Sequence, residues 1–135
     1  MTSALPRPDI TPVSAPYWNA LTEGRLTYQS CACGHRWLPP RADCPNCLGQ
    51  QWTWQTAAGG ATLVSWVVFH TPPSDAFDGL TPYNVAVVQL DEGPRMITNI
   101  DDAPDGKGLR IGQRLTLAIH REDDLAIARF RKATP

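Results

Sequence analysis

Four cysteines in two close pairs constrain the fold of this chain more than any other feature. All four lie between Cys31 and Cys47, as Cys31-Ala-Cys33 and Cys44-Pro-Asn-Cys47. In a reducing compartment such clustering indicates metal ligation before disulfides. Four thiolates around a tetrahedral zinc form a closed site with no position for water or substrate. The sequence therefore predicts a zinc ribbon whose metal stabilises the fold and does no chemistry.

The two cysteine pairs differ in how well they fit a zinc knuckle. Cys44 and Cys47 have the usual two-residue spacing, whereas a single residue separates Cys31 from Cys33 and tightens that turn. His35 or a water molecule could replace one sulfur, and a metal-free ribbon is the alternative. A redox role for Cys44 and Cys47 would need a thioredoxin-like context, which the sequence does not show.

One short helix is expected near the N-terminus. Residues 1–13 are rich in proline and serine without periodicity, so they are expected to form a flexible arm. Residues 14–24 offer Ser14 as N-cap, a proline in the first turn, apolar residues at helical spacing and Gly24 as terminator. Trp18 on this helix either packs onto its own domain or docks against another subunit.

The rest of the chain is expected to be β-structure. Residues 25–29 and 35–38 flank the first cysteine pair as two short ribbon strands. Six later segments are rich in β-branched and aromatic residues, namely 51–56, 61–70, 83–90, 95–100, 114–120 and 126–131. Such strands favour a small closed barrel of the OB type, because closure removes exposed sheet edges. We therefore expect a helix and ribbon over 14–50 and a barrel over 51–135.

Composition limits the classes of function. Twelve basic residues against thirteen acidic ones leave a formal charge of −1, so no general field attracts nucleic acid. The longest apolar run, residues 61–69, is too short to cross a membrane, and the proline-rich start does not resemble a signal peptide. We expect a cytoplasmic protein that binds neither nucleic acid nor membrane.

No catalytic constellation is visible in the sequence. With the thiols committed to metal, the remaining candidates are His35, His70, His120 and scattered carboxylates. None of these forms a recognised pattern of nucleophile, base and orienting group. The chain is therefore expected to have no catalytic residue and no catalysis by itself.

In the order of these features the chain resembles the zinc-ribbon/OB-fold proteins associated with acyl-CoA metabolism, formerly a domain of unknown function. The resembling stretches cover nearly the whole chain; they are residues 17–26 (YWNALTEGRL), 29–34 (QSCACG), 38–41 (LPPR), 44–47 (CPNC), 82–93 (PYNVAVVQLDEG), 111–112 (IG) and 129–131 (RFR). The resemblance implies a mainly β fold: a short N-terminal helix and a rubredoxin-like zinc ribbon, followed by a C-terminal OB-fold barrel. The spacing of Cys31 and Cys33 departs from the two-residue spacing usual in that family.

The resemblance also implies a role. Members of the family are partners of thiolase-fold proteins (thiolases, acyltransferases and side-chain aldolases) in which the thiolase-like chain holds the catalytic residues. Others pair with, or are fused to, enoyl-CoA hydratase-like domains. This chain is accordingly expected to be a noncatalytic subunit of a hetero-oligomer, a heterotetramer, that binds acyl-CoA in lipid or aromatic degradation. The sequence does not indicate which acyl group is bound. It also does not indicate whether the reaction is thiolysis, condensation or retro-aldol cleavage.

Six residues are candidates for contact with CoA or substrate: Arg36, Trp37, Arg41, Phe77, Tyr83 and Asn84. The two arginines suit the phosphates of CoA and the tryptophan suits its adenine; the alternative is that the arginines are ordinary solvated charges. The other three residues lie in or beside the connection over residues 71–82, which is longer than a hairpin needs. The alternative for Phe77 is that it only covers the end of the barrel.

Two other functions are open at this point. Ribbons and OB barrels recur in nucleic-acid-binding modules, and Trp37, Trp52, Trp54 and Trp66 are available to stack on bases. Trp52 and Trp54, however, alternate with polar residues on one strand face, which is typical of a core or a ribbon–barrel interface, and no basic stripe accompanies them. An independent thioester hydrolase is the other possibility, and the missing catalytic constellation disfavours it.

Overall fold

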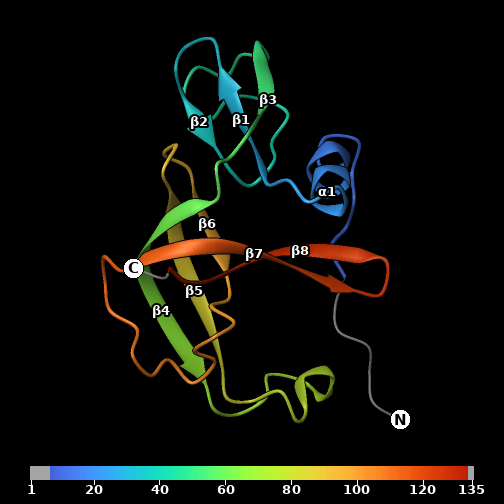
Figure 1. Ribbon diagram of the computed structural model, residues 1–135. Coiled ribbons are helices and arrows are strands. Elements are labelled where there is room, and N and C mark those ends of the chain that lie inside the picture. The colour runs from blue at the N-terminus through green and yellow to red at the C-terminus, as the bar shows by residue number, and fades with distance from the viewer. Residues whose placement is uncertain (1–6, 134–135) are drawn as a thin grey trace.

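The computed structural model describes residues 7–133. Over these residues the chain is mainly β, with one short α-helix, α1 (Ala15–Thr22), and eight strands in two sheets (Figure 1). A three-stranded sheet lies at one end of the molecule, and a five-stranded sheet curls into a barrel at the other. The predicted fold class, a helix and zinc ribbon followed by an OB-fold barrel, is confirmed.

Helix α1 forms because one of its faces is covered by the rest of the chain. Its buried residues are Tyr17, Ala20 and Leu21. Trp18 packs against the same core, with its ring edge-on to Tyr17 at a centroid distance of 5.1 Å. Of the two interpretations of Trp18, packing onto its own domain is therefore the one that the structure shows. Beyond the helix, Gly24 has a φ of 86°, a left-handed conformation that glycine adopts at no steric cost.

The predicted residue, Ser14, stands at the N-cap position but does not make the capping hydrogen bond that the prediction implies. Ser14 stands at the N-cap, but its backbone is helical, with φ −84° and ψ −15°, and its side chain makes no capping bond. An N-cap hydroxyl needs an extended backbone to reach the free N–H groups of the first turn. The Ser14 hydroxyl instead accepts a hydrogen bond from the backbone N–H of Thr11 at 2.9 Å.

The expected N-terminal arm, residues 1–13, lies partly outside the described residues. Within the described part, Arg7 forms an exposed ion pair with Asp124 at 2.9 Å. Flexibility of residues 1–13 stays a prediction, as do the domain limits at 14–50 and 51–135.

The three-stranded sheet is the ribbon, with the order β2-β1-β3 and antiparallel pairing throughout. Its strands are β1 (Thr27–Cys31), β2 (Arg36–Trp37) and β3 (Trp52–Thr56). The sequence grouped residues 51–56 with the barrel strands, whereas β3 pairs with β1. Trp52 packs against the cysteine cluster and Trp54 against the main core, so the predicted position of this pair between ribbon and barrel is confirmed.

The five-stranded sheet has the order β6-β5-β4-β7-β8. Its strands are β4 (Gly60–Phe69), β5 (Tyr83–Leu90), β6 (Arg95–Thr98), β7 (Arg114–Glu122) and β8 (Leu125–Lys132). The sheet closes where the chain leaving β6 meets β8. There Ile100 forms a parallel bridge with Phe130, and the Thr98 hydroxyl donates to the carbonyl of Ala128 at 2.8 Å. We call this contact, between residues 98–101 and 128–130, the closing seam.

Alternate residues of these strands fill the barrel. In β5, residues 84, 86, 88 and 90 are buried and their neighbours point outward. The large side chains of the core are Leu63, Val88, Leu90, Ile100, Leu115 and Phe130. No helix within residues 7–133 is long and apolar enough to cross a membrane.

An exposed ion pair joins β7 to the turn that follows β5. The Arg114 guanidinium donates to both carboxylate oxygens of Asp91, at 2.7 and 2.9 Å. These hydrogen bonds, with the positive charge of Arg114, lower the pKa of Asp91. Gly60 lies beneath the pair, and a Cβ there would stand 2.3 Å from an Asp91 oxygen, so a larger residue would displace the Asp91 carboxylate.

We expect Asp91→Asn to lower the urea midpoint slightly at pH 7. A carboxyl whose pKa is depressed in the folded state adds stability above its unfolded pKa of about 4, and this stability disappears as the pH falls through the folded value. The difference between variant and wild type should therefore shrink as the pH falls below about 4. The effect is small because the side chains of Asp91 and Arg114 are 45% and 55% exposed. Asp78→Asn, on an exposed loop, serves as the control.

Candidate ligand pocket and metal centre

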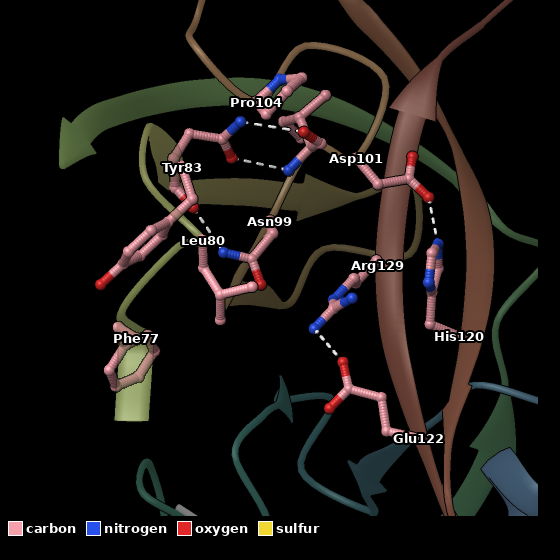
Figure 2. Close-up of a pocket in the computed structure, with 11 residues that line it drawn as sticks. Phe77, Leu80, Tyr83, Asn99, Asp101, Pro104, His120, Glu122 and Arg129 are labelled. Carbon is pink, nitrogen blue, oxygen red and sulfur yellow. Dashed lines mark hydrogen bonds and ion pairs between the residues drawn. The ribbon is translucent and has the colours of Figure 1, made fainter. Parts of the chain in front are cut away.

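A pocket of about 380 Å³ opens on the side of the barrel over the closing seam (Figure 2). It lies between the connection from β4 to β5, the segment that follows β6, and the far end of the β7–β8 hairpin. In OB folds, the loops that join the first two and the last two barrel strands frame the usual ligand-binding face. We call this cavity the side pocket.

One wall of the side pocket is apolar. Phe77, Leu80 and Tyr83 come from the β4–β5 connection and the start of β5, and Ile100 and Pro104 face them. The Phe77 and Tyr83 rings are stacked, with centroids 5.5 Å apart. The Tyr83 ring also stacks on Phe69, at 5.2 Å. Tyr83 is therefore the middle ring of three, which fixes the position of this wall.

The opposite wall is polar and nearly neutral. His120 bonds through Nε2 to the carboxylate of Asp101, and Arg131 lies 3.4 Å from the same carboxylate oxygen. Arg129 donates to Glu122 at 2.8 Å. Each charge thus has a partner of opposite sign or a hydrogen bond. The residues that line the pocket include no serine, threonine, cysteine or lysine.

Asn84, predicted as a contact for substrate or partner, lies in the pocket lining with its side chain hydrogen-bonded to the chain itself. Its side chain is 1% exposed. Its amide donates to the carbonyls of Ile100 and Ala103, at 2.9 and 2.8 Å, and its oxygen accepts from the N–H of Ile100 at 2.7 Å. All of these bonds hold the segment that forms the floor of the side pocket. Asn84 therefore lines the pocket and supports its floor through these hydrogen bonds.

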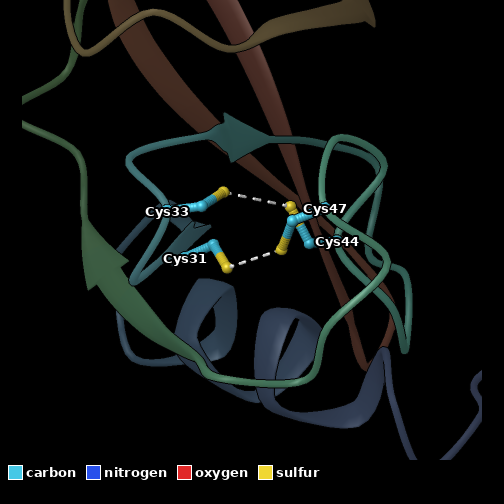
Figure 3. A group of neighbouring side chains, drawn as sticks. All are labelled: Cys31, Cys33, Cys44 and Cys47. Atoms are coloured by element: carbon cyan, nitrogen blue, oxygen red, sulfur yellow. Dashed lines mark hydrogen bonds between the residues drawn. The ribbon is translucent and has the colours of Figure 1, made fainter.

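The four cysteines meet at one point of the ribbon (Figure 3). The Sγ atoms of Cys31 and Cys47 are 3.6 Å apart and those of Cys33 and Cys44 are 3.7 Å apart, and all four lie within 4.8 Å of one another. Four sulfurs at the usual Zn–S distance of about 2.3 Å form a tetrahedron with edges of about 3.8 Å. The thiols therefore already stand close to the geometry that a zinc ion requires.

Two tight turns place the sulfurs, and the short spacing of the first pair is accommodated. The N–H of Gly34 donates to the carbonyl of Cys31 at 2.9 Å, with Gly34 at a φ of 95°. In the second turn, the N–H of Leu48 donates to the carbonyl of Cys44 at 2.8 Å, and Leu48 itself has a φ of 64°. His35, the alternative ligand, stacks on Trp37 and is outside the sulfur cluster.

The environment of Cys33 favours its ionised form. The backbone N–H of His35 and the side-chain amide of Asn46 stabilise the thiolate and lower the pKa of Cys33 to about 6. A thiolate is the form that binds a metal ion. Cys44, by contrast, is completely buried in the small ribbon core.

The structure separates the three ribbon candidates from the side pocket. Trp37 is only 4% exposed and packs against Cys31, Cys44 and Trp52, which gives it a packing role in the ribbon. Arg36 is exposed and donates to the carbonyl of Glu92, in the turn between β5 and β6, at 3.1 Å. Arg41 is also exposed. Phe77, Tyr83 and Asn84 do line the side pocket together.

Sequence reasoning missed the polar wall of the side pocket. His120 was judged an isolated histidine, but Asp101 reaches it from another part of the barrel. Glu122 and Arg129 meet because the β7–β8 hairpin pairs their strands. A hairpin register is readable in principle from the turn at residues 122–125. The meeting of Asp101 with His120 depends on barrel closure and has no local signal.

A four-cysteine metal ribbon joined to a five-stranded OB barrel defines the class of protein, a zinc-ribbon/OB-fold protein. Residues 18–53 match the family described as ChsH2, rubredoxin-like zinc ribbon domain, and residues 54–120 match ChsH2, C-terminal OB-fold domain. The chain belongs to this ChsH2 family, whose members are also called DUF35 proteins. The resemblance seen in the sequence is confirmed.

Relatives from several organisms cover different shares of the chain. A probable enoyl-CoA hydratase alpha subunit of Thermomonospora curvata is 38% identical over 96% of this chain, which spans only 40% of that protein. DUF35 domain-containing scaffold proteins of Pyrococcus furiosus and Methanothermobacter thermautotrophicus are 33% and 32% identical; the alignments cover 64% and 71% of this chain and 63% and 72% of those proteins.

A solved structure supplies a fuller match. One chain of the Ltp2-ChsH2(DUF35) aldolase is 35% identical and superposes with a TM-score of 0.83, over 95% of this chain and 100% of that chain. A DUF35-family protein of unknown function from Sulfolobus solfataricus, 14% identical with a TM-score of 0.66, shares the fold.

Proposed function

We propose that this chain is a noncatalytic subunit of an enzyme complex that acts on CoA thioesters, with the catalytic residues on a thiolase-fold partner. The observation that carries the proposal is the match to the Ltp2-ChsH2(DUF35) aldolase, where the similar chain is covered from end to end at 35% identity. The scaffold proteins of Pyrococcus and Methanothermobacter support the same kind of role. The partner subunit would hold the active site, and this chain would stabilise the partner.

The ribbon would hold one structural zinc in this complex. Cys31, Cys33, Cys44 and Cys47 present four sulfurs at tetrahedral spacing, and four thiolates fill the coordination sphere of zinc. The metal would cross-link two turns that have little core of their own. It would take no part in the reaction.

The ligand of the complex would be an acyl-CoA, held partly by this chain. The side pocket is concave, has an aromatic wall and is nearly neutral, so it suits an uncharged part of the ligand. Phe77 and Tyr83 would make that contact, above the wall that Asn84 supports. The exposed Arg36 and Arg41 suit phosphates instead. Trp37 would keep the ribbon in shape beneath them.

A hydratase complex is the second candidate. The relative from Thermomonospora, a probable enoyl-CoA hydratase alpha subunit, aligns with 96% of this chain but is much longer than it. The same ribbon and barrel can therefore stand beside a hydratase-type unit. The nucleic-acid-binding alternative draws less support, because Trp37 and Trp54 are packed in cores.

Co-expression with a thiolase-fold protein from the same genome tests the proposal. We expect a stable heteromer, with two copies of each chain, in size-exclusion chromatography with light scattering. The complex should release or transfer CoA from a thioester, and the zinc-loaded chain alone should not. Release of CoA by the isolated chain, lost in a folded His120→Ala variant, would contradict the proposal. A hydratase-fold protein tested in parallel decides between the two kinds of partner.

A further inference from the structure

One outward face of the barrel is apolar where a polar face is expected. An antiparallel sheet with one side on the core normally presents polar residues to solvent. On β4, β5 and β6 the outward residues Ser65, Gln89 and Arg95 are polar. Six other outward positions on these strands are apolar: Val67, Phe69, Tyr83, Val85, Val87 and Ile97. We call these six residues the outer apolar face. Val67 is 57% exposed and Ile97 is 72% exposed, so the face is open to solvent.

The register of the strands makes this face continuous. Val67 lies opposite Val85, Phe69 opposite Tyr83, and Val87 opposite Ile97. Cross-strand neighbours of this kind have their Cβ atoms about 5 Å apart, so the side chains touch in pairs across three strands. The members include no charged residue. Contiguous exposed patches of this type mark interaction sites, whereas scattered apolar residues do not.

The chemistry of the face excludes two kinds of ligand. In OB folds the second and third strands, here β5 and β6, form the surface that binds oligonucleotides. Such binding needs basic side chains beside stacking rings. Phe69 and Tyr83 supply rings, but the six residues of the face include no basic side chain. A free acyl chain is enclosed by concave sites, whereas the outer wall of a barrel is convex.

The same convexity argues against a second copy of this chain. Two convex walls touch over a small area, and a stable interface needs roughly 800 Å² from each partner. A different protein with a concave, uncharged surface covers a convex apolar wall much better. The occupant that fits is therefore another polypeptide.

We propose that the outer apolar face is the docking surface for the catalytic partner chain, an inference that rests on the proposed function. The face adjoins the side pocket through Tyr83, whose ring stacks on Phe69 on one side and on Phe77 of the pocket wall on the other. A partner docked here lies next to the opening of the side pocket. A ligand held in that pocket then reaches the partner without crossing solvent.

Ile97→Asp tests this docking surface, with Ile111→Asp as its matched control. The two isoleucines are 72% and 75% exposed, but Ile111 lies in the turn before β7 and is not one of the six residues of the face. The binding of each purified, zinc-loaded variant to the co-expressed thiolase-fold protein is measured by interferometry. We expect Ile97→Asp to weaken binding about tenfold or more, because the partner must bury a carboxylate. Ile111→Asp should change binding less than about twofold.

The outcomes separate this inference from the proposed function. If wild-type chain binds neither a thiolase-fold nor a hydratase-fold protein, the proposed function falls and the inference falls with it. If wild type binds and Ile97→Asp binds equally well, only the docking surface is wrong. A wild-type homodimer that Ile97→Asp dissociates would assign the face to a second copy. Val67→Ser, a milder change, replaces Ile97→Asp if that variant fails to fold by circular dichroism.

Discussion

A Cys44→Ser variant is expected to lose its zinc and to unfold the ribbon while the barrel stays folded. Cys44 is fully buried beside Cys31 and Trp37, in a core that contains little else. Structural zinc contributes on the order of 10 kcal/mol to the folding of small zinc domains. A core of this size cannot replace such a contribution. The main core, from Leu21 to Phe130, does not depend on these residues.

Three measurements check this expectation. Elemental analysis should give close to one zinc per wild-type chain and almost none for Cys44→Ser. Near-ultraviolet circular dichroism should lose the signal of Trp37 and Trp52, which are T-shaped to one another in the ribbon. Far-ultraviolet spectra should retain most of the barrel signal. Gln50→Ala, an exposed residue just beyond the second cysteine turn whose amide bonds to Asp43, is the control and should keep its zinc. A fully metallated Cys44→Ser protein would refute the four-sulfur site.

The second large effect is expected at Asn84. Its replacement by alanine removes three buried hydrogen bonds at once and leaves the carbonyls of Ile100 and Ala103 without their donor. Each buried polar group left unpaired costs about 1–3 kcal/mol. We therefore expect Asn84→Ala to lower the free energy of unfolding by about 3 kcal/mol, and Asn84→Asp to lower it further. Aspartate keeps the shape but turns a second oxygen toward the two carbonyls.

Urea unfolding of both variants checks this order. Asn19→Ala, on the exposed side of α1, changes the same residue type without breaking a buried bond and should shift the midpoint little. If Asn84→Asp were as stable as wild type, the side chain would not be a donor to residues 100 and 103. Its place as the support of the pocket floor would then be wrong.

The strands of the barrel were predictable because their chemistry is local. β5 was expected at 83–90 and lies there. Its residues alternate between buried and outward positions, and this alternation is the pattern that predicts a strand. The four cysteines were likewise readable as one cluster from their spacing. The expected strand at 51–56 exists but pairs with the ribbon, because the alternation of Trp52 and Trp54 defines a strand face and not a neighbour.

The chemistry of the side pocket was less predictable because it depends on closure. Asp101 and His120 come from separate elements and meet only after the barrel has closed. Asn84 was identified as important, but whether its amide faced a ligand or the chain's own carbonyls could not be read from the motif. The aromatic Phe77 and Tyr83 were placed correctly at the long connection, since loop length and residue type are both sequence properties.

The closing seam has a consequence for how the molecule moves. Antiparallel ladders join the other neighbouring barrel strands, and those between β4 and β5 and between β7 and β8 are long. The seam rests on one parallel bridge and a few single bonds around Phe130. The ring can therefore part at this place while each hairpin stays intact. Asn99, Ile100 and Asp101 stand on the seam and also line the side pocket. Parting of the seam would therefore change the shape of the side pocket at the same time.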